Sequence, residues 1–295
     1  MIDAHHHLWS LSAHDYSWLD DAFYRPVHRD FTLADLAPEL AAAGVDRTVL
    51  VEAGSGEPSE TLEFLALAEA SAGVVAGVVG TVDLRSPQPG EVLDMYGAHP
   101  SAHLLVGVRD QLQAIPEAAF AELREILAGL AAVAERGLAY DLVVRPDQLP
   151  GCVALAREVP QLRFVLDHLG KPDVASGLAA LHPWRTALAP LAACENTVAK
   201  LSGLVTEADV RHWTPDDLRP FVETAVELFG PGRVMFGSDW PVCLVAGSFA
   251  EVLDALRASL PALSPGELAE VFGGTAERVY RLRGRQEPSP VDSAS

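Results

Sequence analysis

The stretch Arg163–His168 reads Arg-Phe-Val-Leu-Asp-His, a short apolar run that ends abruptly in two polar side chains. Comparable β-branched runs lie near residues 1–5, 47–53, 74–83, 103–109, 138–145, 197–202 and 233–239. Longer Ala/Leu/Glu-rich segments with helical periodicity separate these eight candidate strands. This alternation predicts an α/β fold, and eight strands favour a (β/α)8 barrel over a doubly wound open sheet, which has the same periodicity.

Helical segments are predicted between most of these strands. They lie at residues 33–43, 59–71, 117–136, 148–158, 178–194, 215–229 and 247–280. Thr214 and Ser264, each followed by proline and acidic residues, are typical helix starts. Residues 284–295 have no core pattern and predict a flexible tail, which leaves residues 1–283 as a single barrel domain.

The composition excludes several classes of function. The 295 residues contain 21 Lys and Arg against 41 Asp and Glu, a formal charge of -20 that repels nucleic acids and anionic membrane surfaces. Cys152, Cys194 and Cys243 are too scattered for a disulfide framework, which favours a reducing compartment. We see no signal segment and no uninterrupted apolar stretch long enough to span a membrane, so the expected location is the cytoplasm.

Polar residues at strand ends are the candidates for function, because barrel active sites collect at the carboxyl ends of the strands. In the run His5-His6-His7, strand alternation points His5 and His7 to one side, where they could bind a metal or polarise one oxygen. His168 and Asp239 each end an apolar strand at a sharp turn. Surface histidines, a buried structural histidine and a helix cap are the alternative interpretations.

Other polar residues and several absences carry less information. Arg109 at the end of the fourth strand could bind a ligand or form a salt bridge on the rim, and Asp141 within the fifth strand needs a partner if buried. Lys171 and Lys200 are the two lysines of the chain, and neither lies near the fourth strand, where a carboxylated lysine would bridge two metals. The GxSxG, P-loop and GxGxxG motifs are absent.

Three motifs resemble the lactonase branch of the amidohydrolase superfamily, and in particular its L-fuconolactonase-like members. They are Asp-Ala-His-His-His-Leu-Trp at 3–9, Leu-Asp-His-Leu-Gly-Lys-Pro at 166–172 and Phe-Gly-Ser-Asp-Trp-Pro-Val at 236–242, and the similarity extends over residues 1–283. This resemblance implies a distorted (β/α)8 TIM barrel and an active-site set of His5, His7, His168 and Asp239.

The resemblance also implies a mechanism. Asp239 would activate water to open a sugar (aldono) lactone, while the histidines either donate hydrogen bonds to the oxyanion or bind one divalent metal. Imidazole and carboxylate ligands suit Zn²⁺, although activity could do without it. Arg109, Asp141, Trp18 and Trp213 are the expected substrate-binding residues.

Alternative functions remain open on the same barrel. A zinc-dependent amidohydrolase, a decarboxylase and a lactonase for a carboxylated lactone use similar sites, and a barrel retained only for binding would be expected to lack part of the set. A small-molecule lactone is the expected partner of a monomer or homo-oligomer.

Overall fold

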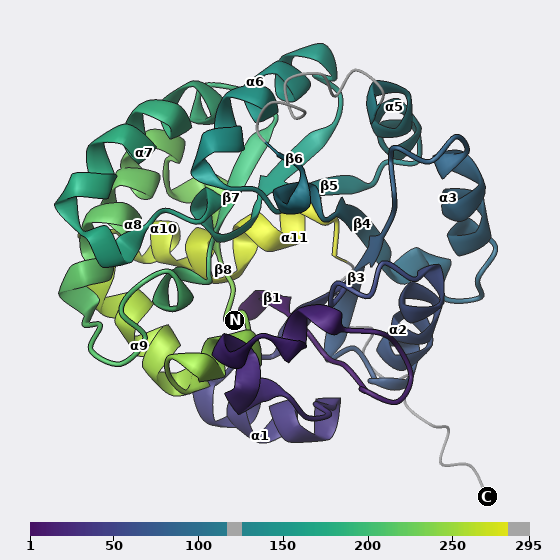
Figure 1. Cartoon of the computed structure of the whole chain (residues 1–295), viewed down its shortest axis with the longest axis horizontal. Helices are drawn as coiled ribbons and strands as arrows, with labels where there is room; N and C mark the ends of the chain where they lie inside the picture. Colours follow the sequence, from purple (N-terminus) through teal and green to yellow (C-terminus); the bar gives the residue numbers. More distant parts are fainter. Residues whose placement is uncertain (117–125, 283–295) are drawn as a thin grey trace, which may run out of the picture.

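The computed structural model describes residues 1–116 and 126–282, and its centre is a ring of eight strands (Figure 1). The strands are β1 Ile2–His6, β2 Arg47–Val51, β3 Val75–Thr81, β4 Leu105–Asp110, β5 Ala139–Leu142, β6 Arg163–Leu166, β7 Thr197–Leu201 and β8 Val234–Phe236. All neighbouring strands pair in parallel, and their order in the sheet follows their order in the chain. The predicted barrel is therefore confirmed, and the doubly wound open sheet is excluded.

Most strands end earlier than the sequence runs predict, although β1 and β4 each end one residue later. β6 ends at Leu166 and β8 at Phe236, so that Asp167, His168 and Asp239 lie in the turns that follow. These polar residues lie just beyond the carboxyl ends of the strands. Active-site residues of this fold lie at the same end of the barrel.

Helices surround the ring. They are α1 Leu33–Ala43, α2 Pro58–Ala70, α3 Pro89–Gly97, α5 Leu127–Glu135, α6 Leu149–Glu158, α7 Leu178–Ala192, α8 Pro215–Phe229, α9 Phe249–Ser259, α10 Pro265–Ala269 and α11 Thr275–Val279. Thr214 and Ser264 start α8 and α10 with capping boxes, as predicted.

The helical stretch predicted over residues 247–280, with a second start at Ser264, divides further into α9, α10, a π-helical turn at Glu270–Gly274 and α11. Leu260 adopts an extended backbone before Pro261, which ends α9. The short helix α3 was not predicted, because Pro89 and Gly90 obscure its start. The first part of the helix predicted at 117–136 and the predicted tail at 284–295 lie outside the described residues.

Two apolar clusters hold the layers together. The larger cluster packs the outer face of the strands against the helices. The smaller cluster combines strand residues such as Val79, Val165 and Met235 with Val279, the last residue of α11, and with Tyr280, which follows it. Because alternate strand residues face the interior of a barrel, this second cluster fills the lumen, and α11 lies across the middle of the ring (Figure 1).

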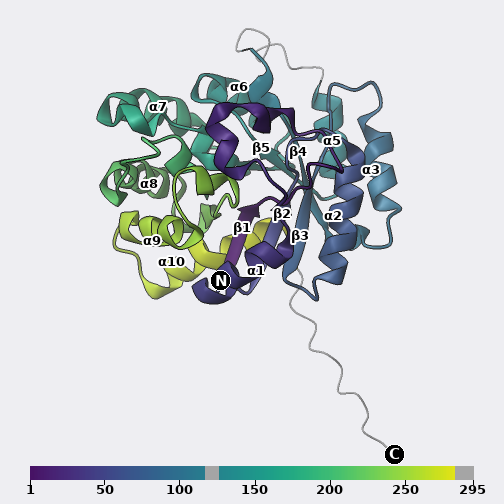
Figure 2. The same ribbon diagram turned by 60° about the horizontal axis from the view of Figure 1, so that its bottom comes forward.

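The seam between β1 and β8 is closed by side chains and an isolated bridge between His6 and Trp240. The backbone N–H of Ser238 donates to Asp3 Oδ1 at 2.9 Å, and its hydroxyl donates to Asp3 Oδ2 at 2.6 Å. The segment that follows β1 then crosses the end of the barrel where the strands finish (Figure 2). Within residues 1–116 and 126–282, no helix has the length and apolar character to span a membrane.

Candidate active site

The first two site residues lie at the end of β1. His5 and His7 point to the same side of the strand, and their Nε2 atoms are 3.0 Å apart. His6 points the other way, and its Nε2 lies 2.9 Å from the hydroxyl of Thr48. The alternation expected from the sequence is therefore present, and it separates His6 from the pair.

His168 and Asp239 approach this pair from β6 and β8. His168 has φ 52° and Asp239 has φ 58°, so both sit in the left-handed region that side chains other than glycine rarely adopt. Asp239 Oδ1 lies 3.5 Å from His7 Nε2, 3.7 Å from His5 Nε2 and 4.0 Å from His168 Nε2. The structure thus brings His5, His7, His168 and Asp239 together around one point.

The protonation of the four groups follows from their surroundings. Burial lowers the pKa of His168 to about 4 and that of His5 well below its usual value, so both rings are neutral near pH 7. Burial by itself would raise the pKa of the Asp239 carboxyl, but the neighbouring His168, His7 and Lys171 hold that pKa below its usual value. The cluster therefore combines the neutral imidazoles of His5 and His168 with the ionised carboxylate of Asp239.

This donor set has the spacing of a metal site. Two nitrogen ligands at 2.0–2.1 Å from a tetrahedral Zn²⁺ stand about 3.3 Å apart, and the measured separations of 3.0–4.0 Å bracket that value. His7 Nδ1 donates to the carbonyl of Val51 at 2.9 Å, which leaves the lone pair of Nε2 directed at the cluster. His5, His7 and Asp239, and also His5, Asp167 and His168, are groups that could hold an ion.

A cavity of about 370 Å³ opens next to this cluster. Trp18, Phe23 and Tyr24, from the segment after β1, form an aromatic wall. Trp18 is held there by a 2.9 Å hydrogen bond from its Nε1 to the carbonyl of Ala53. The polar part of the described lining consists of His7, Ser17, Arg109, Gln111, Gln113, His168, Lys171, Thr206, Glu207 and Asp239.

The family follows from sequence comparison over nearly the entire chain. Residues 2–282 match the amidohydrolase family. The chain belongs to this family. It is 39% identical to an L-fucono-1,5-lactonase of Burkholderia multivorans over 99% of this chain and 98% of the relative. An L-fucono-1,5-lactonase of Burkholderia ambifaria is 36% identical over 95% of both chains.

Solved structures agree with this amidohydrolase assignment. The crystal structure of an amidohydrolase from Burkholderia multivorans with bound zinc superposes with a TM-score of 0.87 at 39% identity, covering 96% of this chain and 99% of that one. A 2-pyrone-4,6-dicarboxylic acid hydrolase structure from Acinetobacter baumannii, at 18% identity and a TM-score of 0.73, shares the fold.

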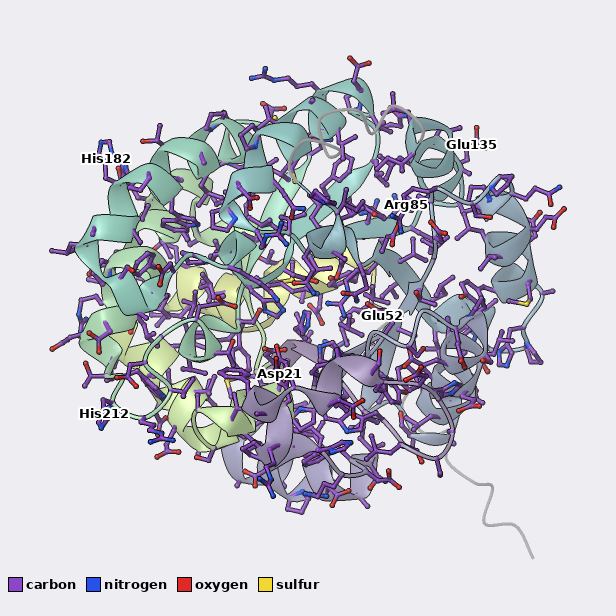
Figure 3. The ribbon with its side chains drawn as sticks, in the orientation of Figure 1. Asp21, Glu52, Arg85, Glu135, His182 and His212 are labelled. Carbon is purple, nitrogen blue, oxygen red and sulfur yellow. The ribbon has the colours of Figure 1, made fainter. Side chains whose placement is uncertain are left out.

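Beneath the cluster, this amidohydrolase buries an ionic network inside the barrel. Arg109 Nε donates to Glu52 Oε1 at 2.6 Å, and its Nη1 donates to Asp167 Oδ2 at 2.9 Å. Lys200 Nζ donates to Asp141 Oδ2 at 2.6 Å and lies 2.9 Å from Asp167 Oδ1. Glu52 lies near the middle of the ring, far from peripheral side chains such as His182 and His212 (Figure 3).

Two of the expected substrate-binding residues lie outside the cavity. Asp141 is fully buried, and its Oδ2 also accepts a 2.7 Å hydrogen bond from Tyr280. Trp213 does not line the cavity either, and its Nε1 donates to the carbonyl of Ala246 at 2.9 Å. Asp141 pairs with Lys200 and Trp213 contacts the backbone of Ala246, whereas Trp18 and Arg109 reach the cavity lining.

The sequence analysis did not assign roles to four charged residues around the site. Glu52 and Asp167 balance Arg109, while Lys171 and Glu207 face the cavity. The sequence considers Lys171 only as a possible metal bridge and places Asp167 within the predicted strand. For Glu52 and Asp167, the signal that could have found them is the same one that indicated His168, namely a polar residue directly after a buried strand. Lys171 and Glu207 lie further along the turns after β6 and β7 and carry no such signal.

Proposed function

We propose that this amidohydrolase hydrolyses a neutral sugar lactone of the aldono-1,5-lactone class, such as L-fucono-1,5-lactone. The observation that carries the proposal is the convergence of His5, His7, His168 and Asp239 beside a cavity with an aromatic wall and a polar lining. The two Burkholderia relatives named L-fucono-1,5-lactonases support it. Sugars bind where an aromatic face covers their C–H groups and polar side chains meet their hydroxyls.

In the proposed reaction, Asp239 takes the proton from the attacking water. Its carboxylate is ionised at neutral pH and lies within 4.0 Å of all three imidazole Nε2 atoms. A water bound between these groups would have Asp239 as its acceptor and the lactone carbonyl as its target. Asp239 then returns the proton to the alkoxide that leaves when the ring opens.

The tautomer of His7 bears on how the carbonyl oxygen is polarised. The Nδ1–H of His7 donates to the backbone carbonyl of Val51. A neutral ring in this tautomer has no Nε2–H to donate to an oxyanion. His5, His7, His168 and Asp239 would instead hold a Zn²⁺, which when bound supplies Lewis-acid polarisation and activates water. The bound zinc in the related amidohydrolase structure from Burkholderia multivorans supports the choice of metal.

The charges of the cavity favour a neutral substrate over a dicarboxylate. Arg109 lines the cavity, but its guanidinium is already paired with Glu52 and Asp167. Asp239 and Glu207 place two further carboxylates on the lining against the ammonium of Lys171. Among the described lining residues, a carboxylated lactone would therefore find no unpaired guanidinium group, whereas hydroxyl groups can bind to all of these side chains.

Proton release from a panel of lactones tests the proposal. We expect turnover of L-fucono-1,5-lactone and related aldonolactones. Asp239→Asn should lower kcat by a factor on the order of 10² or more with the fold intact, because general-base catalysis contributes that much. Hydrolysis of a pyrone dicarboxylate with no activity on any aldonolactone would contradict the substrate class, and near-wild-type turnover by Asp239→Asn would contradict the assigned base.

A further inference from the structure

The turn after β6 has a strained backbone that the proposed catalytic set explains only in part. His168, Leu169 and Lys171 have φ values of 52°, 54° and 53°, and Gly170 between them has φ 70°. A non-glycine residue in this region costs about 1–2 kcal/mol, and such residues cluster at functional sites. His168 belongs to the catalytic cluster and Leu169 is buried in the core, but Lys171 has no assigned role.

The strained turn places the ammonium group of Lys171 on the cavity lining. Its Nζ donates one hydrogen bond, to Gln113 Oε1 at 2.7 Å. An ammonium carries three donors, and among the described residues no second hydrogen-bond partner is present for this one. Within residues 1–116 and 126–282, two N–H donors of this lining residue therefore have no protein partner and can bind a ligand.

Glu207 faces Lys171 across the lining from the turn after β7. Its backbone carbonyl accepts from Ala175 N at 2.9 Å, which ties this turn to the one after β6. Burial raises the pKa of the Glu207 carboxyl, and Lys171 is the largest influence that opposes this rise. Among the described residues its carboxylate has no hydrogen-bond donor, and the two charged groups do not approach within the 4.0 Å of a direct ion pair.

We propose that Lys171 and Glu207 form a hydroxyl-binding pair that selects polyhydroxylated lactones, a statement that rests on the proposed function. A hydroxyl of the sugar ring lies between them, accepts a hydrogen bond from Lys171 and donates one to Glu207. A hydroxyl is both a donor and an acceptor, so this pair satisfies it completely. A lactone without hydroxyls leaves this ammonium and this carboxylate without a ligand partner in the cavity. Because unpaired charged groups are costly, such a site strongly favours a hydroxylated lactone over one that lacks the hydroxyls.

The first measurement uses the unmodified protein and two six-membered lactones. L-Fucono-1,5-lactone carries ring hydroxyls, and δ-valerolactone has the same ester ring without them. We expect kcat/KM to favour the hydroxylated lactone. A wild-type enzyme that hydrolyses both lactones with a ratio near one overturns the hydroxyl-binding pair and leaves the lactonase proposal standing, whereas no hydrolysis of any lactone in the panel contradicts the proposed function itself.

The second measurement changes the pair. Lys171→Met and Glu207→Gln should each lower the preference for L-fucono-1,5-lactone over δ-valerolactone by about 10- to 100-fold, mainly through KM, because each removes a charged hydrogen bond made in the ground and transition states alike. Their effects on this preference should not add in the double variant, since the same hydroxyl is held by both residues.

Glu223→Gln is the matched control, because Glu223 is an exposed carboxylate on α8. It removes one negative charge and should leave the preference unchanged. Thermal unfolding of each variant checks that the fold is retained. If Lys171→Met lowers kcat equally for both lactones, the ammonium acts on the reacting ester, and the hydroxyl-binding role is overturned.

Discussion

Arg109 lines the cavity, but its guanidinium group forms its hydrogen bonds with other residues of the protein. Nε and Nη2 bind the side chain and the backbone carbonyl of Glu52, and Nη1 binds Asp167. Burial alone would lower the pKa of Arg109, but the two carboxylates raise it above its usual value. The sequence could not separate a ligand contact from a salt bridge, and the structure favours the salt bridge.

We expect Arg109→Met to act on stability before it acts on substrate binding. It leaves the fully buried Glu52 without its cation and Asp167 with Lys200 alone, which costs about 3–5 kcal/mol of unfolding free energy. Urea unfolding measures this loss. Arg85→Met is the control, because that side chain is 46% exposed and should change stability by no more than about 0.5 kcal/mol. Unchanged stability with a strongly raised KM would show that Arg109 binds the substrate.

At the scale of elements, the turns after β6 and β7 fit together through one glycine. Gly203 has φ 65°, and a Cβ built on it would lie 2.5 Å from His168 Nδ1. His168 Nδ1 also lies 2.9 Å from the hydroxyl of Ser202, so the same turn orients the ring and allows it to approach. The ring of His168 can therefore occupy this position only because Gly203, just beyond the end of β7, has no side chain.

Gly203→Ala should displace the His168 ring and lower kcat by a factor of about 10² or more, since small displacements in an active site are costly. Gly230→Ala is the control, because Gly230 also has positive φ, at 76°, but its Cβ would meet nothing within 4 Å. That variant should lose about 1 kcal/mol of stability and keep its kcat. Equal kcat values for the two variants would contradict the role of the close contact.

A second element contact fastens the segment after β1, which carries the aromatic wall, to α2. His14 Nδ1 lies 2.7 Å from Glu57 Oε2, and His14 Nε2 lies 3.1 Å from Glu63 Oε2. Although burial opposes the charge, hydrogen bonds to these two carboxylates raise the pKa of His14. The protonated imidazole therefore bridges the segment and the helix.

This bridge should make a small part of the stability depend on pH. Because the pKa of His14 is higher in the folded state, its contribution is present below the unfolded value near 6.5 and is lost as the pH rises through the folded value. We expect His14→Gln to lose about 0.5–1 kcal/mol at pH 5.5 and almost nothing at pH 9, as measured by urea unfolding. An equal difference in unfolding free energy between His14→Gln and the wild type at both pH values would contradict the ionic bridge.

At the scale of the whole molecule, the candidate metal ligands join β1, β6 and β8 across the seam of the barrel. A ligand that binds only the folded state stabilises it by about 2.7 kcal/mol at a hundred times its Kd. Added ZnCl₂ should therefore raise the Tm of the wild-type protein, and His7→Ala should abolish this rise.

The neighbouring histidine supplies a control for the zinc experiment. His6 points away from the cluster to Thr48, so His6→Gln should keep the zinc-dependent rise in Tm even if its starting Tm is lower. If zinc leaves the Tm of the wild-type protein unchanged, or raises that of His7→Ala equally, the proposed ligand set is wrong.

The sequence by itself determined the features that depend on local periodicity. Eight apolar runs separated by helical segments indicated the barrel, and alternation along β1 placed His5 and His7 on one side, away from His6. A parallel barrel brings the ends of its strands together, so charged residues at strand ends such as His168 and Asp239 could be predicted to meet.

The tertiary structure alone decided which charged residues pair with one another. Asp141 and Lys200 lie on different strands and neutralise each other inside the barrel, whereas Lys171 and Glu207 come from two turns and face the cavity without forming an ion pair. All four follow or interrupt apolar runs, so their local sequences look alike. The difference arises from distances between strands far apart in the chain, because Coulomb and hydrogen-bond energies depend on separation in space and not on position in the sequence.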